Sequence, residues 1–127
     1  MSEKSNLFKQ YCKIWSDKFH LDYVIYFLEK CCKEDENKIA YAILDCAACV
    51  ATIYLSTEEI DKLSSAEIES IAFEEICHLL LTPITYLLNN FYNAEYIIEL
   101  EHIIINKMKR SHGLCIITPT QQSNQLL

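Results

Sequence analysis

The feature that most constrains the fold is an apolar segment, residues 65–88, that contains two adjacent carboxylates near its middle. Ser64 and Glu67 have the spacing of a capping box, which predicts that a helix begins here. One of the two carboxylates, Glu75, falls on the apolar face of this helix. An ionised carboxylate is costly to bury unless it is paired or binds a metal, so the segment predicts a charged site inside the protein.

The same segment contains the string E-E-x-x-H, formed by Glu74, Glu75 and His78. It matches the H-E-x-x-H motif of zinc-dependent proteases, except that Glu74 stands where the first His would be. Glu74 and His78 are one helical turn apart, so both could bind the same metal ion. Glu75 would lie beside that ion and could act as the general base. The residues therefore predict a metal site, and the alternative is an acidic helix turn that is partly exposed to solvent.

A third metal ligand has to come from another segment, and the predicted C-terminal helix, residues 94–110, offers two candidates. Glu101 falls on an apolar stripe of that helix, where a carboxylate needs a partner, so we favour Glu101 as the third ligand. His102 is the second candidate. His20 and His112 lie at a helix end and beyond the last helix, and we interpret both as incidental.

The acidic composition argues against several partners. The net charge is −7, and the only local cluster of cations, residues 107–110, lies where cations favour the end of a helix. No run reaches the roughly 18 apolar residues that span a bilayer, and residues 1–10 lack the apolar core of a signal peptide. We therefore expect a cytoplasmic protein that binds neither nucleic acid nor membranes.

Cysteine is frequent in this chain, with seven residues, of which Cys46 and Cys49 form the single C-x-x-C pair. A structural zinc site needs two such pairs, or one pair together with further His or Cys ligands. We therefore interpret the cysteines as buried free thiols, and a metal or redox pair at Cys46 and Cys49 is the alternative.

The periodicity of apolar residues predicts an α+β fold in one domain. We expect helices at residues 7–19, 57–63, 65–88 and 94–110, and strands at residues 21–29, 39–44 and 48–55. The strands follow one another with short connections, which favours a small antiparallel sheet. Residues 1–113 would form the domain, and residues 114–127 would form a flexible tail.

Three stretches together resemble the small zinc metallopeptidase-like proteins of phages and prophages. They are A-T-I-Y-L at residues 51–55, E-I-C-H-L-L-L-T-P-I at residues 75–84 and L-E-H at residues 100–102. The resemblance implies a minimal zincin fold, in which a small sheet packs on the helix of the active site. It also implies that the last strand is an edge strand that pairs with an extended substrate.

Carried over by position, the resemblance implies that Glu75 is the general base, that His78 is a zinc ligand and that Glu101 is the downstream acidic ligand. Glu74 departs from the family pattern. Two carboxylates and one His make a harder, more anionic set of ligands than the family's, which favours manganese, iron or no metal. The cofactor expected here is accordingly zinc or another divalent metal, or no metal.

Three hypotheses about function follow. We favour a degenerate zincin-like protein that acts as a non-catalytic or weakly active protein-binding module in a phage-infected cell. The alternative is an active metal-dependent peptidase that uses Glu75 as general base. The third hypothesis is an unrelated α+β domain in which E-E-x-x-H is a coincidence. The expected partner is a protein or peptide, and an exposed sheet edge would also allow a homodimer.

Overall fold

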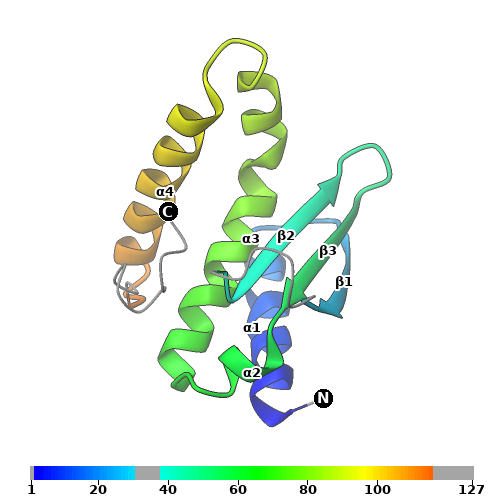
Figure 1. The fold of residues 1–127 in the computed structure, drawn as a ribbon, viewed down its shortest axis with the longest axis vertical. Coiled ribbons are helices and arrows are strands. Elements are labelled where there is room, and N and C mark those ends of the chain that lie inside the picture. The colour runs from blue at the N-terminus through cyan, green and yellow to red at the C-terminus, as the bar shows by residue number, and fades with distance from the viewer. Residues whose placement is uncertain (1, 31–37, 116–127) are drawn as a thin grey trace.

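The structure is a computed structural model that describes residues 2–30 and 38–115. Its elements are α1 (Glu3–Lys18), β1 (Val24–Glu29), β2 (Ala40–Asp45), β3 (Val50–Leu55), α2 (Thr57–Ile60), α3 (Ser65–Leu88) and α4 (Ala94–Ser111). The predicted α+β layout is confirmed: an N-terminal helix, a three-stranded sheet, a long central helix and a C-terminal helix (Figure 1).

The sheet is mixed, with the strand order β1-β3-β2. Strands β2 and β3 form an antiparallel hairpin in which Ala42 lies opposite Ile53, whereas β1 is parallel to β3 and pairs Phe27 with the same residue. The expectation of antiparallel pairing throughout is therefore wrong for one pair of strands. The expectation that the last strand lies at the sheet edge is also wrong, because β3 is the central strand. Alternation of apolar residues predicts strands but does not specify their neighbours.

One face of the sheet is covered by helices. Ala51, Ile53 and Leu55 of β3 are fully buried on this face, where α1 and α3 lie against the sheet (Figure 1). Phe8 of α1 meets Phe27 of β1 edge to face, with ring centroids 6.3 Å apart. This face and the helices on it form the hydrophobic core, and α3 lies in its centre.

Helix α3 is buried from Ile68 to Leu79 on several sides, because α1 and the sheet pack on it and α4 contacts it as well. Beyond Pro83 it continues with α4 as a helical hairpin that extends past the sheet (Figure 1). By length and composition alone, α3 could cross a membrane. The central helix of a folded core satisfies the same criterion, and Glu74 and Glu75 lie in the buried part of α3.

Both ends of α4 are marked by residues that are typical of helix ends. Asn93 caps α4 by accepting hydrogen bonds from the backbone N–H groups of its first turn. Gly113 adopts a left-handed conformation with φ of 69°, and the N–H of Leu114 donates to the carbonyl of Lys109 at 2.9 Å, which ends the helix. The predicted tail lies, from residue 116 onward, outside the described residues.

The capping box at the start of α3 is expected to contribute to the stability of the protein. The N–H of Glu67 donates to the Ser64 hydroxyl at 3.2 Å, and the N–H of Ser64 donates to the Glu67 carboxylate at 3.0 Å. We expect Ser64→Ala to lower the free energy of unfolding by about 1 kcal/mol, measured by urea denaturation. Glu67→Gln keeps both hydrogen bonds and is the control. An equal loss in both variants would show that the hydroxyl cap is not the cause.

Candidate metal centre

The three residues of the E-E-x-x-H string form one cluster on α3. The potential ligand atoms of Glu74, Glu75 and His78 all lie within 4.8 Å of one another. Glu74 is 9% exposed and Glu75 is 4% exposed, so an acidic turn facing solvent is excluded. Glu74, Glu75 and His78 therefore lie together mostly inside the protein, and this group could hold a metal ion.

Helix α4 adds the predicted third residue to this cluster. The carboxylate of Glu101 accepts a hydrogen bond from Nδ1 of His78. The ring of His102 lies edge to face with the ring of His78, with centroids 6.0 Å apart. Both candidates for a third ligand thus reach the cluster, and Glu101 is the one in direct contact with His78.

The structure also places a buried cation in the cluster. Lys109 is fully buried, and its Nζ lies 3.2 Å from Oε1 of Glu74. Lys109 does lie in the last turn of α4, as the helix-end interpretation expects, but that interpretation did not include its burial. The sequence contained a signal for its position, because Lys109 follows Ile105 by four residues and Glu101 by eight, on the face of α4 that packs inward.

Burial and charge perturb the protonation of Glu75. Removal from solvent raises the pKa of this carboxyl well above its usual value, and the neighbouring Glu74 raises it further. Lys38, two residues before β2, and Lys109 lower the pKa. Glu75 is therefore held in an environment that favours its neutral form, with two cations limiting the effect.

Burial also lowers the pKa of His78 to about 4, against the opposing influence of Glu74. The imidazole is accordingly neutral near pH 7. Its contact with Glu101 is a hydrogen bond that Nδ1–H donates to the carboxylate. A neutral imidazole whose Nδ1–H is held by a carboxylate has its other nitrogen oriented, as is common for metal ligands.

The chemistry of these donors fits a divalent metal only in part. Carboxylate oxygens and an imidazole nitrogen are suitable ligands. However, the ammonium of Lys109 already neutralises Glu74, the residue that departs from the protease motif. A metal held by Glu74 would therefore face a fixed positive charge inside the protein, where repulsion between cations is strong.

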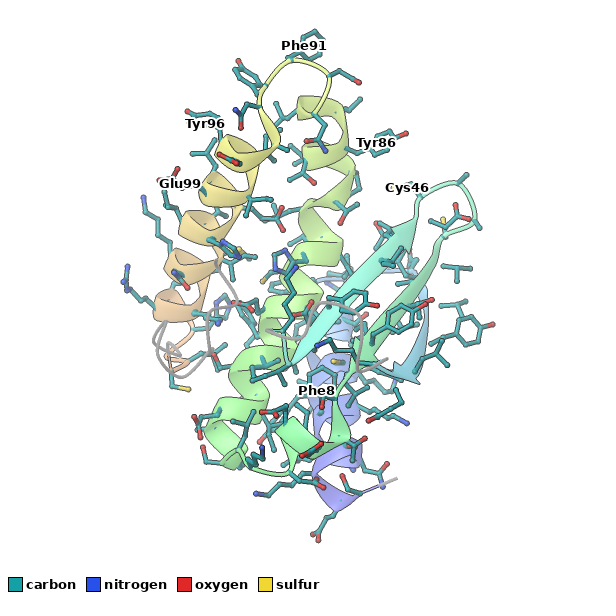
Figure 2. The ribbon with its side chains drawn as sticks, viewed as in Figure 1. Phe8, Cys46, Tyr86, Phe91, Tyr96 and Glu99 are labelled. Atoms are coloured by element: carbon teal, nitrogen blue, oxygen red, sulfur yellow. The ribbon has the colours of Figure 1, made fainter. Side chains whose placement is uncertain are left out.

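The C-x-x-C pair lies outside this cluster, between two strands of the sheet. Cys46 and Cys49 are exposed and free in the turn between β2 and β3 (Figure 2). The expectation that they are buried is wrong, because both lie in the turn after β2 ends at Asp45 and before β3 begins at Val50. Cys12 and Cys77 are buried free thiols, as expected. Cys31 and Cys32 lie outside the described residues.

Comparisons of the chain with protein-family models, curated proteins and solved structures gave no significant match. The resemblance to phage zincin-like proteins therefore stays a prediction that rests on the residues of the motif.

Proposed function

We propose that this protein is a degenerate zincin-like protein that acts as a non-catalytic or weakly active protein-binding module. The observation that supports this most is the buried ion pair between Lys109 and Glu74. In a protease of the H-E-x-x-H type, the first ligand position faces the metal. Here that position holds a carboxylate, and the positive charge beside it belongs to the protein itself. The lysine thus supplies permanently the charge that a metal would supply when bound.

The burial of Glu75 supports the same proposal. A general base has to come within hydrogen-bond reach of the proton that it accepts. Glu75 is 4% exposed, so it is poorly accessible to a substrate or to water. A cluster that is charged, paired and largely buried serves to hold α3 and α4 in register, and the surfaces of the fold are left for binding.

The resemblance to phage proteins is the sole basis for the place and partner that we propose. The protein would act in the cytoplasm of a phage-infected cell and would bind a host or phage protein or a peptide. The sheet edges available for strand addition are β1 and β2, because β3 is central.

An active metal-dependent peptidase is the second candidate, and a specific contact favours it. His78 is neutral, is oriented by Glu101 and lies within 4.8 Å of two carboxylates. Glu74, His78 and Glu101 would hold a zinc or another divalent ion, and Glu75 would be the base. On this hypothesis, Glu75→Gln would abolish a peptidase activity that depends on added metal.

Elemental analysis of the purified protein by mass spectrometry distinguishes the two candidates. We expect the natural protein to contain no stoichiometric metal and its thermal unfolding to be unchanged by a chelator, because Lys109 occupies the charge site. His78→Ala is the matched variant and should also be metal-free. One equivalent of metal in the natural protein, lost in His78→Ala, would contradict the proposal and would justify assays with peptide substrates.

A further inference from the structure

Helix α4 has a second apolar stripe that no part of the described chain covers. Its inward face packs against α3 through Ile97 and Ile105, which are buried. On a neighbouring face of the helix, apolar side chains recur at positions i, i+4, i+7 and i+8, the spacing of a helix that packs on another helix. They are Tyr96, Leu100, Ile103 and Ile104, and we call this set the outer stripe.

The outer stripe is accessible in this structure. Tyr96 is 52% exposed, Ile103 is 44% exposed and Ile104 is 43% exposed. Figure 2 shows Tyr96 and Glu99 on the side of α4 that points away from α3. The ring of Tyr92, in the turn before α4, contacts the ring of Tyr96 and extends the apolar surface beyond the helix. A helix that is apolar on more than one face is typical of a helix that packs on more than one neighbour.

Charges beside the outer stripe change sign along the helix. Glu95 and Glu99 lie in its first half, and Lys107 and Arg110 lie in its second half, all of them exposed. If two copies of α4 pack antiparallel with Ile103 on the two-fold axis, Glu99 of each copy lies level with Lys107 of the other. Both residues are four positions, or about 6 Å, from the axis. The same alignment brings Arg110 level with Tyr96 and next to Glu95.

We propose that the outer stripe is the interface of a symmetric homodimer, in which α4 packs antiparallel on α4 of a second copy. A two-fold interface requires a surface that is complementary to itself. The pattern of acid, apolar centre and base meets that requirement when the second helix is reversed. Helix-dipole effects also favour acidic first turns and basic last turns, but they do not account for an exposed apolar stripe between them.

The small size of the outer stripe suggests that the homodimer is weak. The contact uses one helix and one adjoining tyrosine from each copy. This is a small contact, because a standard specific interface buries about 800 Å² per partner. The dimer should therefore form in the micromolar range and should dissociate on dilution. The proposed contact leaves β1 and β2 free, so it is compatible with a partner that binds at a sheet edge.

Sedimentation equilibrium of the full chain, from low micromolar to near-millimolar concentration, tests this proposal. We expect a monomer–dimer equilibrium in the natural protein. Ile103→Glu should weaken it by more than about tenfold, because two carboxylates would face each other at the axis. Glu99→Lys should also weaken it by about tenfold, because each new lysine would face Lys107 of the second copy.

The decisive variant combines Glu99→Lys with Lys107→Glu, which exchanges the two charges. It should restore dimerisation to within about threefold of the natural protein, since every cross-copy contact regains opposite charges. Glu58 of α2 is exposed and lies away from the interface. Glu58→Lys makes the same charge change there and should have no effect on dimerisation. A natural protein that stays monomeric throughout, or a dimer that is insensitive to the single variants, would overturn the proposal. Failure of the double variant to recover would do the same.

Discussion

Replacing Lys109 by Met is expected to lower the free energy of unfolding by about 3–5 kcal/mol, measured by urea denaturation. The ammonium of Lys109 is fully buried and lies 3.2 Å from Glu74. Without it, the Glu74 carboxylate remains inside the protein beside Glu75 and has lost this ion pair. Small domains are stable by about 5–15 kcal/mol, so this single change should leave a marginally stable protein.

A second substitution distinguishes loss of charge pairing from loss of packing. Lys109→Met combined with Glu74→Met removes both charges and keeps unbranched side chains of similar size. We expect the double variant to recover most of the lost stability, because buried ion pairs can often be replaced by apolar residues at little cost. If the double variant is as unstable as Lys109→Met alone, the effect comes from packing and the ion pair is not its source.

The chain contains a matched surface pair for comparison. Lys62 lies 3.3 Å from Glu59, almost the same distance, but these side chains are 62% and 46% exposed. Surface pairs contribute about 0–1 kcal/mol, so Lys62→Met should change stability little. Similar losses in Lys62→Met and Lys109→Met would contradict the argument that burial makes the Lys109–Glu74 pair important.

Local signals in the sequence predicted the helices well. Ser64 with Glu67 marks the start of α3, and Asn93 and Gly113 mark the two ends of α4. These signals are reliable because each satisfies specific backbone groups within one turn of the helix. The start of α1 was placed too late, at residue 7, because the helix begins at Glu3 and is capped by Ser2.

The spacing of charged residues in apolar stripes also predicted much of the site. Glu75 was expected to be buried and is buried, and Glu101 was expected near His78 and contacts it. The partner of Glu74 was missed, because a lysine near the end of a helix has a sufficient explanation in the helix dipole. The spacing of Lys109 from Glu101 and Ile105 places it on the inward face of α4, but only the packing of α4 on α3 brings it to Glu74.

The arrangement of the sheet could not be read from local patterns. The alternation in β3 predicts which side chains are buried, and Ala51 and Ile53 follow it. It carries no information on whether β1 or β2 lies beside it, or in which direction. That choice depends on how the strands fit against α1 and α3 as a whole, so the parallel pairing of β1 with β3 appears only in the folded structure.

Changing Glu74 to His should not by itself recreate a zinc site, but combining it with Lys109→Met should. Together with His78 and Glu101, the new side chain would complete two His and one Glu, a ligand set known from zinc proteases. In the single variant, the ammonium of Lys109 remains buried beside the position of the new ligand and repels a divalent cation. We therefore expect Lys109→Met to tighten zinc binding in the Glu74→His background by at least about tenfold.

Isothermal titration with zinc measures this difference, and thermal unfolding gives an independent readout. At a zinc concentration 100 times the dissociation constant, the double variant should gain about 2.7 kcal/mol of stability, which a chelator should remove. Adding His78→Ala to the double variant should abolish both effects, because that residue is required in the ligand set. Equal zinc affinity in Glu74→His with and without Lys109→Met would show that the lysine does not exclude the metal. Absence of zinc binding in both variants would show that α3 and α4 do not have the geometry of a zincin site, and the proposal of a zincin-like fold would then be wrong.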